Sequence, residues 1–272
     1  MKIALSIAGS DSCGGAGIQL DLKVFQVLGV HGVSVLTALT AQNTRGVERV
    51  HHVPRVFVAA QIDALISDLP VAAAKTGMLA RAEVVEAVAE RIQRRSIPNL
   101  VVDPVILAKD GTPLLSSRGL LLLKKRLLPQ AIAVTPNVPE AEALSGVKIR
   151  DETSLCEAAR HIAGLGVRAV IIKGGHLSGE PVDTLFLDGE FTQFPGRRIE
   201  GVPVHGTGCL YSAALTARLA LGDALPEACR IAKETVTRAI TNSIALGKGS
   251  RLAVLSPSPD DACRAALRRL PL

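Results

Sequence analysis

The chain has 272 residues, of which 48% are hydrophobic and 21% charged, and this balance suits a globular protein and excludes an intrinsically disordered one. Its formal net charge of +6 favours anionic small molecules, whereas dispersed positive residues and an aromatic content of 2% argue against a nucleic-acid binder. The five cysteines form no CxxC pair, which predicts reduced thiols rather than a disulfide framework or a zinc cluster. No apolar run reaches the roughly 18 residues of a membrane span, so we expect a soluble, cytoplasmic protein.

In chain order, short β-rich runs alternate with longer runs of helical periodicity. The predicted strands are residues 2–8, 33–39, 72–75, 99–103, 131–135 and 168–173, with a hairpin over 183–194 that turns at Asp188-Gly189. The predicted helices are residues 18–28, 56–69, 82–95, 119–128, 154–166, 208–221, 225–246 and 259–269. Strands followed by helices of this length indicate βαβ units, and we expect one α/β domain over residues 1–272 with a mostly parallel sheet covered on both faces.

Polar and glycine residues follow nearly every predicted strand. The segments concerned are residues 9–17, 40–44, 76–78, 103–104, 136–140 and 174–176. In open α/β sheets ligands bind outside the carboxyl ends of the strands. The sequence therefore predicts an active site at that edge of the sheet.

The first of these segments, GSDSCGGAG, is rich in glycine but matches no common phosphate-binding fingerprint. It lacks the GxGxxG of dinucleotide-binding turns, and Gly14 is followed by Gly15-Ala16 instead of the Lys-Ser/Thr of a Walker A loop. Its glycines fit either a tight strand–helix turn or a close approach of backbone to a ligand. Asp21, one turn into the next helix, either faces solvent or binds that ligand.

Two further segments carry residues suited to phosphate and metal chemistry. In TPNVPEAE, Asn137 and Glu140 fit a helix N-cap and first turn, and the same side chains could orient a hydrated Mg²⁺, joined by Asp103 at the end of its strand. In KGGH, Lys173 ends a strand, where it either binds phosphate or extends into solvent beside a turn. His176 has no second ligand at metal-binding spacing, so a structural role is favoured.

The motif HGTGC, residues 205–209, leaves several functions open. A glycine-flanked helix start exposes unpaired N–H groups and the positive end of the helix dipole, which favours an anion site. The same field is expected to lower the pKa of Cys209 and favour its thiolate. A nucleophilic cysteine could use His205 as its base, but no third orienting residue is evident, and a redox role lacks a resolving partner. A packed small residue is the remaining alternative.

Taken together and in order, the motifs resemble a known family. IAGSDSCGGAGIQLDLK, AQNT, KTGML, VVDPVILAKDGTPLL, TPNVPEAEALSG, VIIKGGHL and HGTGC resemble the bacterial hydroxymethylpyrimidine/phosphomethylpyrimidine kinases, over roughly residues 3 to 220. The resemblance implies a ribokinase-like three-layer α/β/α sandwich without the lid of sugar kinases, as a homodimer. It implies ATP- and Mg²⁺-dependent phosphorylation of 4-amino-5-hydroxymethyl-2-methylpyrimidine and then of its monophosphate.

The resemblance also implies roles for individual residues. Asp21 and Gln42 would hydrogen-bond the pyrimidine, and Gly9 and Met78 would line its pocket. The residues near Mg²⁺ and the phosphates of ATP would be Asp103, Asn137, Glu140, Lys173 and Thr207. Gly206, Thr207 and Gly208 would form the anion hole, beside Cys209 as general base or hydroxyl-orienting group. Most of the superfamily has aspartate at that last position.

Some positions depart from the family's usual pattern, and other functions stay open. The first glycine loop reads Asp11-Ser12-Cys13 where the family usually has Asp-Pro-Ser. Pro203-Val204 replaces a usual Asn-Thr before HGTGC, and Leu210-Tyr211 replaces small polar residues after it. The alternatives are a pyridoxal/pyridoxine kinase of the same fold, a non-catalytic ligand-binding homologue and a cysteine hydrolase.

Overall fold

The computed structural model describes residues 1–95, 97–107, 113–176, 180–199, 201 and 203–255. Its strands are β1 (Ile3–Ala8), β2 (His31–Leu36), β3 (Ala38–Asn43), β4 (Gly46–His52), β5 (Val71–Thr76), β6 (Leu100–Val102), β7 (Ala133–Val134), β8 (Ala169–Ile172), β9 (Asp183–Leu187), β10 (Glu190–Phe194), β11 (Val204–His205) and β12 (Arg251–Leu252). Its α-helices are α1 (Gly17–Val27), α2 (Arg55–Asp68), α3 (Ala82–Arg95), α4 (Ser117–Leu122), α5 (Val138–Ser145), α6 (Glu152–Ala163), α7 (Thr207–Leu221) and α8 (Leu225–Thr241).

An eight-stranded sheet in the order β10-β9-β8-β7-β6-β5-β1-β2 forms the centre of the molecule. Neighbouring strands from β2 to β8 run parallel, whereas β9 is antiparallel to β8 and to β10. The link from β8 to β9 contains no crossover α-helix among its described residues, and a direct return of the chain pairs strands antiparallel. The expected α/β fold with a mostly parallel sheet is confirmed. The single domain over residues 1–272 stays a prediction, because residues 256–272 lie outside the described part.

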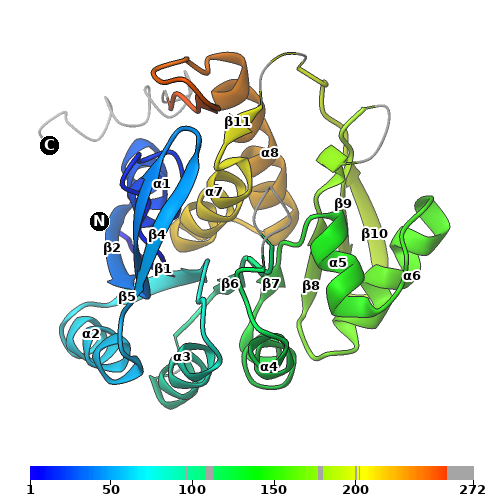
Figure 1. Cartoon of the computed structure of the whole chain (residues 1–272). Coiled ribbons are helices and arrows are strands. Elements are labelled where there is room, and N and C mark those ends of the chain that lie inside the picture. Colours follow the sequence, from blue (N-terminus) through cyan, green and yellow to red (C-terminus); the bar gives the residue numbers. More distant parts are fainter. Residues whose placement is uncertain (96, 108–112, 177–179, 200, 202, 256–272) are drawn as a thin grey trace, which may run out of the picture.

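Helices cover both faces of this sheet, as Figure 1 shows, with α2, α3 and α4 on one face and α1, α7 and α8 on the other. The strands divide their side chains between the two layers by simple alternation. In β8, for example, Val170 and Ile172 belong to one buried cluster and Ala169 and Ile171 to the other. Strands that are apolar on both faces are the reason the sheet is buried on both sides.

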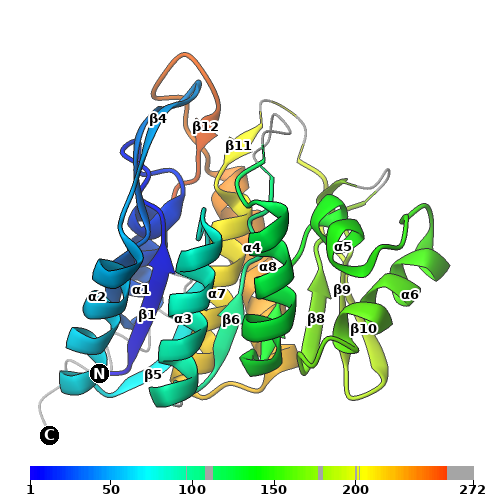
Figure 2. The ribbon, with the colours of Figure 1, turned by 60° about the horizontal axis from the view of Figure 1, so that its bottom comes forward.

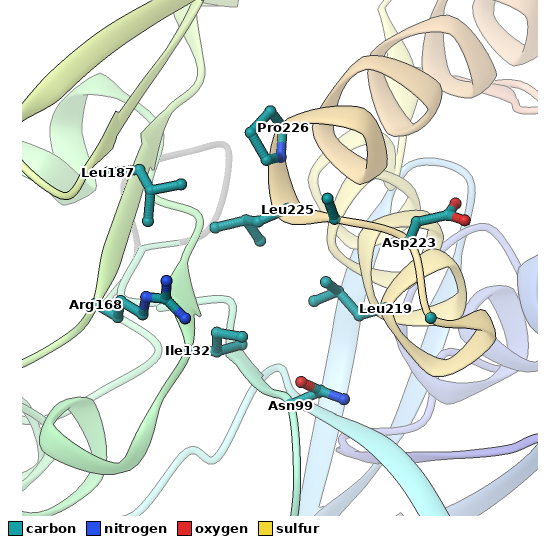
Figure 3. Close-up of a pocket in the computed structure, with 10 residues that line it drawn as sticks. Asn99, Ile132, Arg168, Leu187, Leu219, Asp223, Leu225 and Pro226 are labelled. Carbon is teal, nitrogen blue, oxygen red and sulfur yellow. The ribbon is translucent and has the colours of Figure 1, made fainter.

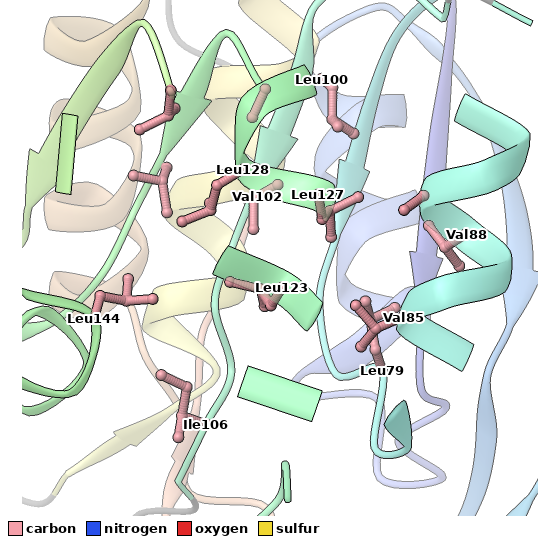
Figure 4. Close-up of a cluster of buried hydrophobic side chains, with 14 of the residues drawn as sticks. Leu79, Val85, Val88, Leu100, Val102, Ile106, Leu123, Leu127, Leu128 and Leu144 are labelled. Carbon is pink, nitrogen blue, oxygen red and sulfur yellow. The ribbon is translucent and has the colours of Figure 1, made fainter. Parts of the chain in front are cut away.

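The packing between the sheet and α3 shows how tightly this layer is built. Leu79, Val85 and Val88 point toward Leu123 and Leu127, between α3 and the segment that follows α4 (Figure 4). That segment continues α4 as a π-helix over Leu123–Leu127 and a 3₁₀ turn over Leu128–Gln130, where the sequence predicted one helix over 119–128. Each fully buried leucine or valine here contributes about 1.5–3 kcal/mol to folding.

The β3–β4 hairpin is the main departure from the predicted elements. Residues 33–39 were expected to form one strand, but β2 ends at Leu36 and β3 leaves the central sheet to pair with β4. The resemblance, which implies no lid of the sugar-kinase type, did not predict this second small sheet. Figure 2 shows the hairpin rising at the same end of the molecule as β11 and β12. The turn letters Asn43-Thr44-Arg45-Gly46 were the available signal.

Several helix boundaries also differ. The helix expected over 225–246 ends at Thr241, because the chain then pairs Ile244 with Leu252 as an isolated bridge. The helix expected over 154–166 is α6, which begins earlier because Asp151 and Ser154 form a capping box. The hairpin of β9 and β10 turns at Asp188-Gly189 as predicted, with both residues at positive φ. The helix expected over 259–269 lies outside the described residues.

A cavity of about 480 Å³ lies at the opposite end of the sheet from the predicted site. Figure 3 shows Leu187, Leu219 and Leu225 around it, with Asn99 and Arg168 from the amino ends of β6 and β8. None of the predicted site residues lines it. Its two charged side chains already have partners, because Arg168 pairs with Asp188 and Asp223 with Arg218. Within the described ranges, no helix is both long and apolar enough to cross a bilayer.

Candidate active site

The predicted site residues gather at the carboxyl end of the parallel strands. Gly9 follows β1, Met78 follows β5, Asp103 follows β6, and Lys173 follows β8. Asn137 and Glu140 come between β7 and the first turn of α5. Gln42 reaches the same edge from β3, and residues 206–209 from the start of α7. This arrangement confirms the expected edge of the sheet, and we call it the carboxyl rim.

The start of α7 is docked on the first glycine loop. Gly206 is the N-cap, with a left-handed φ of 77°, and a Cβ added there would lie 1.8 Å from the Gly15 carbonyl oxygen. Only glycine fits such a position. No side chain caps the helix, so its first N–H groups remain directed at the rim. A Cβ at Gly208 would lie 3.3 Å from Lys173 Nζ, which places the lysine beside these N–H groups.

A buried lysine–aspartate pair lies at the centre of the rim. Lys173 Nζ donates to Asp103 Oδ1 at 3.1 Å, and the Ser212 hydroxyl donates to Asp103 Oδ2 at 3.1 Å. Burial disfavours the charged form of both side chains, but attraction between opposite charges outweighs the effect of burial. Lys173 and Lys75 lower the pKa of Asp103, while Asp103 and Glu140 raise the pKa of Lys173. The lysine is therefore a fixed positive charge at the rim, of the kind that suits phosphate.

Asn137 and Glu140 form a reciprocal capping box at the start of α5. The Glu140 N–H donates to Asn137 Oδ1 at 2.9 Å, and the Asn137 N–H donates to Glu140 Oε2 at 2.8 Å. The backbone of Asn137 also bridges to Lys173 of the neighbouring strand end. The helix-cap interpretation is confirmed, and the metal-binding role of the same two residues stays a prediction. The cap fixes Glu140 beside the Lys173–Asp103 pair.

The residues around Glu140 fit a hydrated cation better than a fully protein-held one. Glu140 is 5% exposed, and burial raises its pKa to about 7, although Lys173 lowers it; repulsion from Asp103 adds to the effect of burial. A nearby cation would relieve this cost. No group of three His, Cys, Asp or Glu side chains in the described residues could hold a metal ion. Mg²⁺, which keeps several waters, suits such a site through water and phosphate oxygens.

We expect Glu140 to make the ligand-free protein less stable as pH rises toward neutrality. Its pKa is raised from 4.5 to about 7 by folding, so its contribution is complete below pH 4.5 and is lost as pH rises through 7. Urea unfolding should be measured at pH 5 and at pH 8, without nucleotide or Mg²⁺. Between these two pH values the free energy of unfolding of the wild type should fall by on the order of 3 kcal/mol more than that of Glu140→Gln. Equal losses in both proteins would contradict this assignment. Glu157→Gln, an exposed change on α6, is the control.

Cys209 is a protonated thiol here, which corrects the expectation of a thiolate. Burial raises its pKa to about 11, and Asp103 and Asp21 add to this effect, whereas Lys75 and the Gly17 N–H favour the thiolate. Burial and two carboxylates thus outweigh the field of the helix start. His205 does not act as its base in this structure, because the imidazole Nε2 faces Asp11 and Gln42 instead. The cysteine hydrolase alternative loses its general base.

Asp21 lies beneath the rim instead of on its surface. It is 0% exposed, and its two oxygens accept from Lys75 Nζ at 2.8 Å and from the Ser6 hydroxyl at 2.6 Å. This excludes the solvent-facing alternative for Asp21, and its ligand role stays a prediction. Each carboxylate oxygen can accept a further hydrogen bond, so these contacts leave a direct bond to a ligand open, whereas breaking the buried ion pair would cost about 3–5 kcal/mol.

The other residues assigned to a ring pocket do meet. A Cβ on Gly9 would lie 2.5 Å from Met78 Cε, so the end of the methionine side chain packs directly against this glycine. Gln42 comes close through the hairpin, whose backbone is tied to the first glycine loop: the Gln42 N–H donates to the Ser12 hydroxyl oxygen at 2.9 Å. These contacts bring the first loop, the hairpin and the segment after β5 together at one side of the rim.

Sequence reasoning missed several residues that organise the site. Ser212, one turn after Cys209, holds Asp103, and Lys75 is buried in an otherwise apolar strand. A lysine within VAAAKT was the signal for a buried partner. Asp183 accepts the Gly174 N–H at 3.0 Å and pairs with Lys233, which anchors the loop after Lys173. No local pattern marks Asp183, because its partners are distant in sequence.

The fold and the rim together define a small-molecule kinase with a ribokinase-like sheet. The family profile described as phosphomethylpyrimidine kinase matches residues 11–253, and the chain belongs to this family. This confirms the resemblance seen in the sequence.

Named relatives agree with this. The chain is 44% identical over 254 residues to a hydroxymethylpyrimidine/phosphomethylpyrimidine kinase of Haemophilus influenzae, covering 92% of this chain and 94% of that protein. It is 51% identical over 246 residues to the thiamine biosynthesis bifunctional protein ThiED of Geobacter sulfurreducens, which covers 90% of this chain but only 50% of that protein. The chain thus spans about half the length of that bifunctional relative.

Solved structures of two kinds are similar. A phosphomethylpyrimidine kinase from Clostridium difficile superposes with a TM-score of 0.80 at 40% identity, covering 88% of this chain and 100% of that one. An ADP complex of Bacillus subtilis pyridoxal kinase superposes with a TM-score of 0.85 at 36% identity, covering 93% and 96%.

Proposed function

We propose that the protein transfers the γ-phosphoryl group of ATP to the hydroxymethyl group of 4-amino-5-hydroxymethyl-2-methylpyrimidine, and then phosphorylates the monophosphate to the diphosphate, in thiamine biosynthesis. The observation that carries this proposal is the hydrogen-bonded pair of Asp103 and Lys173 beside the start of α7 at the rim, in a chain of this family. Phosphoryl transfer depends on positioning and charge stabilisation, and this cluster supplies both.

Three sets of groups form the phosphate half of the site, where the phosphates of ATP and Mg²⁺ would bind. Lys173 holds a positive charge beside Gly208, and the first N–H groups of α7, from Thr207 and Gly208, offer an anion hole to the transferred group. Asn137 and Glu140 would hold Mg²⁺ through waters, with Asp103 nearby. When bound, Mg²⁺ would offset charge on the phosphate oxygens. Bound ADP in the Bacillus subtilis pyridoxal kinase supports ATP as the donor.

The ring half consists of Gly9, Met78 and Gln42, with Asp21 in support. The buried Asp21–Lys75 pair lies beneath this region, and Lys75 lowers the pKa of the Cys209 thiol against the larger effect of burial. Asp21 thus contributes by fixing Lys75, and its oxygens keep lone pairs for a direct hydrogen bond to the ring. Cys209 lies where ring and phosphate halves meet. As a thiol, Cys209 accepts a hydrogen bond from the substrate hydroxyl or donates one to it, and so orients that hydroxyl for attack.

Replacing Cys209 with alanine should lower kcat by about 100-fold while the KM for ATP stays within about twofold, because only the orienting or proton-accepting group is lost. Cys209→Ser should fall between the two proteins, since a hydroxyl can also orient the substrate but ionises less readily than a thiol. Steady-state kinetics with the pyrimidine measures both constants. Cys156→Ala, in α6 away from the rim, is the matched control. An undiminished kcat in Cys209→Ala would remove Cys209 from the mechanism.

A vitamin B6 kinase is the second candidate, favoured by one observation: the pyridoxal kinase structure superposes with a higher TM-score, 0.85, than the phosphomethylpyrimidine kinase structure, 0.80. Pyridoxal also carries a hydroxymethyl group on a heteroaromatic ring. The sequence identities point the other way, 40% against 36%. The pyrimidine is therefore the first choice.

Product analysis by mass spectrometry decides between the candidates. Purified protein, ATP and Mg²⁺ are offered the pyrimidine and, in a separate reaction, pyridoxal. Pyrimidine diphosphate establishes both steps, and shows that the departures at Pro203-Val204 and Leu210-Tyr211 are tolerated. Monophosphate alone removes the second step. Turnover of pyridoxal only reassigns the substrate, and no turnover of either favours a non-catalytic homologue.

We also propose a cytoplasmic homodimer. Large apolar side chains are exposed on the β3–β4 hairpin and the first turn of α2, which suits burial against a second copy; they are Leu39, Val47, Val50, Val56 and Phe57. Light scattering measures the molar mass in solution, and a value near 28.4 kDa, the mass of one chain, would contradict the dimer.

A further inference from the structure

His205 joins three segments that are distant in sequence. Its Nε2 lies 3.1 Å from Asp11 Oδ2 in the first glycine loop and 2.9 Å from the Gln42 amide on β3. His205 itself is on β11, directly before the N-cap Gly206. A Cβ at Gly15 would lie 2.9 Å from the imidazole Cδ2, so the ring packs directly on the loop backbone.

Asp11 is a firmly held acceptor for this ring. It is 2% exposed and accepts N–H groups from Cys13 at 2.9 Å, Gly15 at 3.1 Å and Ala16 at 2.8 Å. Burial raises the pKa of its carboxyl, but His205 and these N–H groups outweigh burial and lower it overall. A carboxylate accepts hydrogen bonds and cannot donate them. The imidazole Nε2 must therefore carry the hydrogen that Asp11 accepts.

That hydrogen dictates the orientation of the Gln42 amide. A protonated Nε2 has no lone pair for an N–H donor, so the amide must turn its oxygen toward His205, where it shares the single Nε2 hydrogen with Asp11. Thr40 requires the same orientation independently. Its hydroxyl donates its one hydrogen to the Ser10 carbonyl oxygen at 2.8 Å, so the end of the Gln42 amide 3.2 Å away must be the NH₂ group that donates to it. A half-turn of the amide satisfies both neighbours without any change in volume.

We propose that His205 is a positioning residue that fixes Gln42 with its amide oxygen toward Nε2, so that the second hydrogen of the NH₂ group is offered to a ring nitrogen of the substrate. This rests on the proposed function, in which Gln42 binds a heteroaromatic ring. The NH₂ group has two hydrogens, and Thr40 uses one. The ligand that fits is a heteroaromatic ring with an unprotonated nitrogen acceptor.

The ring proton can be tested without any substrate. Two-dimensional ¹⁵N NMR of the ligand-free protein separates imidazole tautomers, and His205→Phe identifies the His205 signals among the six histidines of the chain. We expect Nε2 of His205 to carry a hydrogen. An unprotonated Nε2 would overturn this proposal whatever the protein phosphorylates. The proposed function is tested separately, by product analysis.

The effect on Gln42 is tested by binding. His205→Phe keeps a ring against Gly15 but removes the hydrogen, and should weaken binding of 4-amino-5-hydroxymethyl-2-methylpyrimidine about tenfold by calorimetry, while the KM for ATP changes by less than about twofold. Gln42→Glu keeps the acceptor toward His205 but loses the donor, and should weaken pyrimidine binding similarly. In the double variant the losses should not add.

His161→Phe, in the exposed last turn of α6, is the control and should bind as wild type does. His205→Gln restores a donor and should recover most of the binding. Unchanged pyrimidine binding in His205→Phe, or an equal loss for ATP, would overturn the positioning role, as would fully additive losses in the double variant.

Discussion

Gly206→Ala should lower kcat by roughly 100- to 1000-fold, although the substitution adds only one methyl group. The new Cβ would meet the Gly15 carbonyl oxygen at 1.8 Å, so the start of α7 must move away from the first glycine loop. The N–H groups of the anion hole move with it. Single-turnover kinetics with saturating ATP measures the loss in the chemical step.

The backbone cost of this change has a matched control on the same helix. Gly222 follows the other end of α7, also at positive φ, but a Cβ there has open space within 4 Å. Gly222→Ala should therefore cost only about 1–2 kcal/mol of stability and leave kcat unchanged. If Gly206→Ala retains kcat within about twofold, the start of α7 is not the anion hole.

Lys173→Met should lower kcat/KM for ATP by roughly 100- to 1000-fold, because the fixed positive charge beside Gly208 is lost. It should also destabilise the protein by about 3 kcal/mol, since Asp103, 3% exposed, keeps its charge but loses its ion-pair partner. Urea unfolding and initial rates at varied ATP separate the two effects.

A double variant distinguishes catalysis from folding. Lys173→Met with Asp103→Asn removes both charges, so most of the stability should return while kcat/KM stays low. Recovery of activity together with stability would show that Lys173 only holds the fold. Full activity of Lys173→Met at saturating ATP would remove it from transition-state stabilisation and leave it a role in ground-state binding.

These expectations concern a group of residues whose place, the carboxyl end of the parallel strands, could be predicted from the sequence. Short apolar, β-rich runs, each followed by a helix, predicted the parallel sheet, since strands that are apolar on both faces must be covered on both sides. The polar segments after the strands then had to meet at one edge. Asn137 was readable as a helix cap from TPNVPEAE alone, because a capping box is a local interaction. The order of motifs carried the family resemblance.

The tertiary structure decided what depends on distant neighbours. Asp21 has the pattern of an exposed or ligand-facing residue, yet Lys75, 54 positions away, draws it into a buried pair. The helix start alone suggested a thiolate at Cys209, but burial beside Asp103 and Asp21 keeps the proton. His205 meets Asp11 across 194 positions. The sequence by itself determined the sheet, its rim and the residue types there. Which groups are charged, and which are turned toward a ligand, followed only from contacts between segments that no local pattern records.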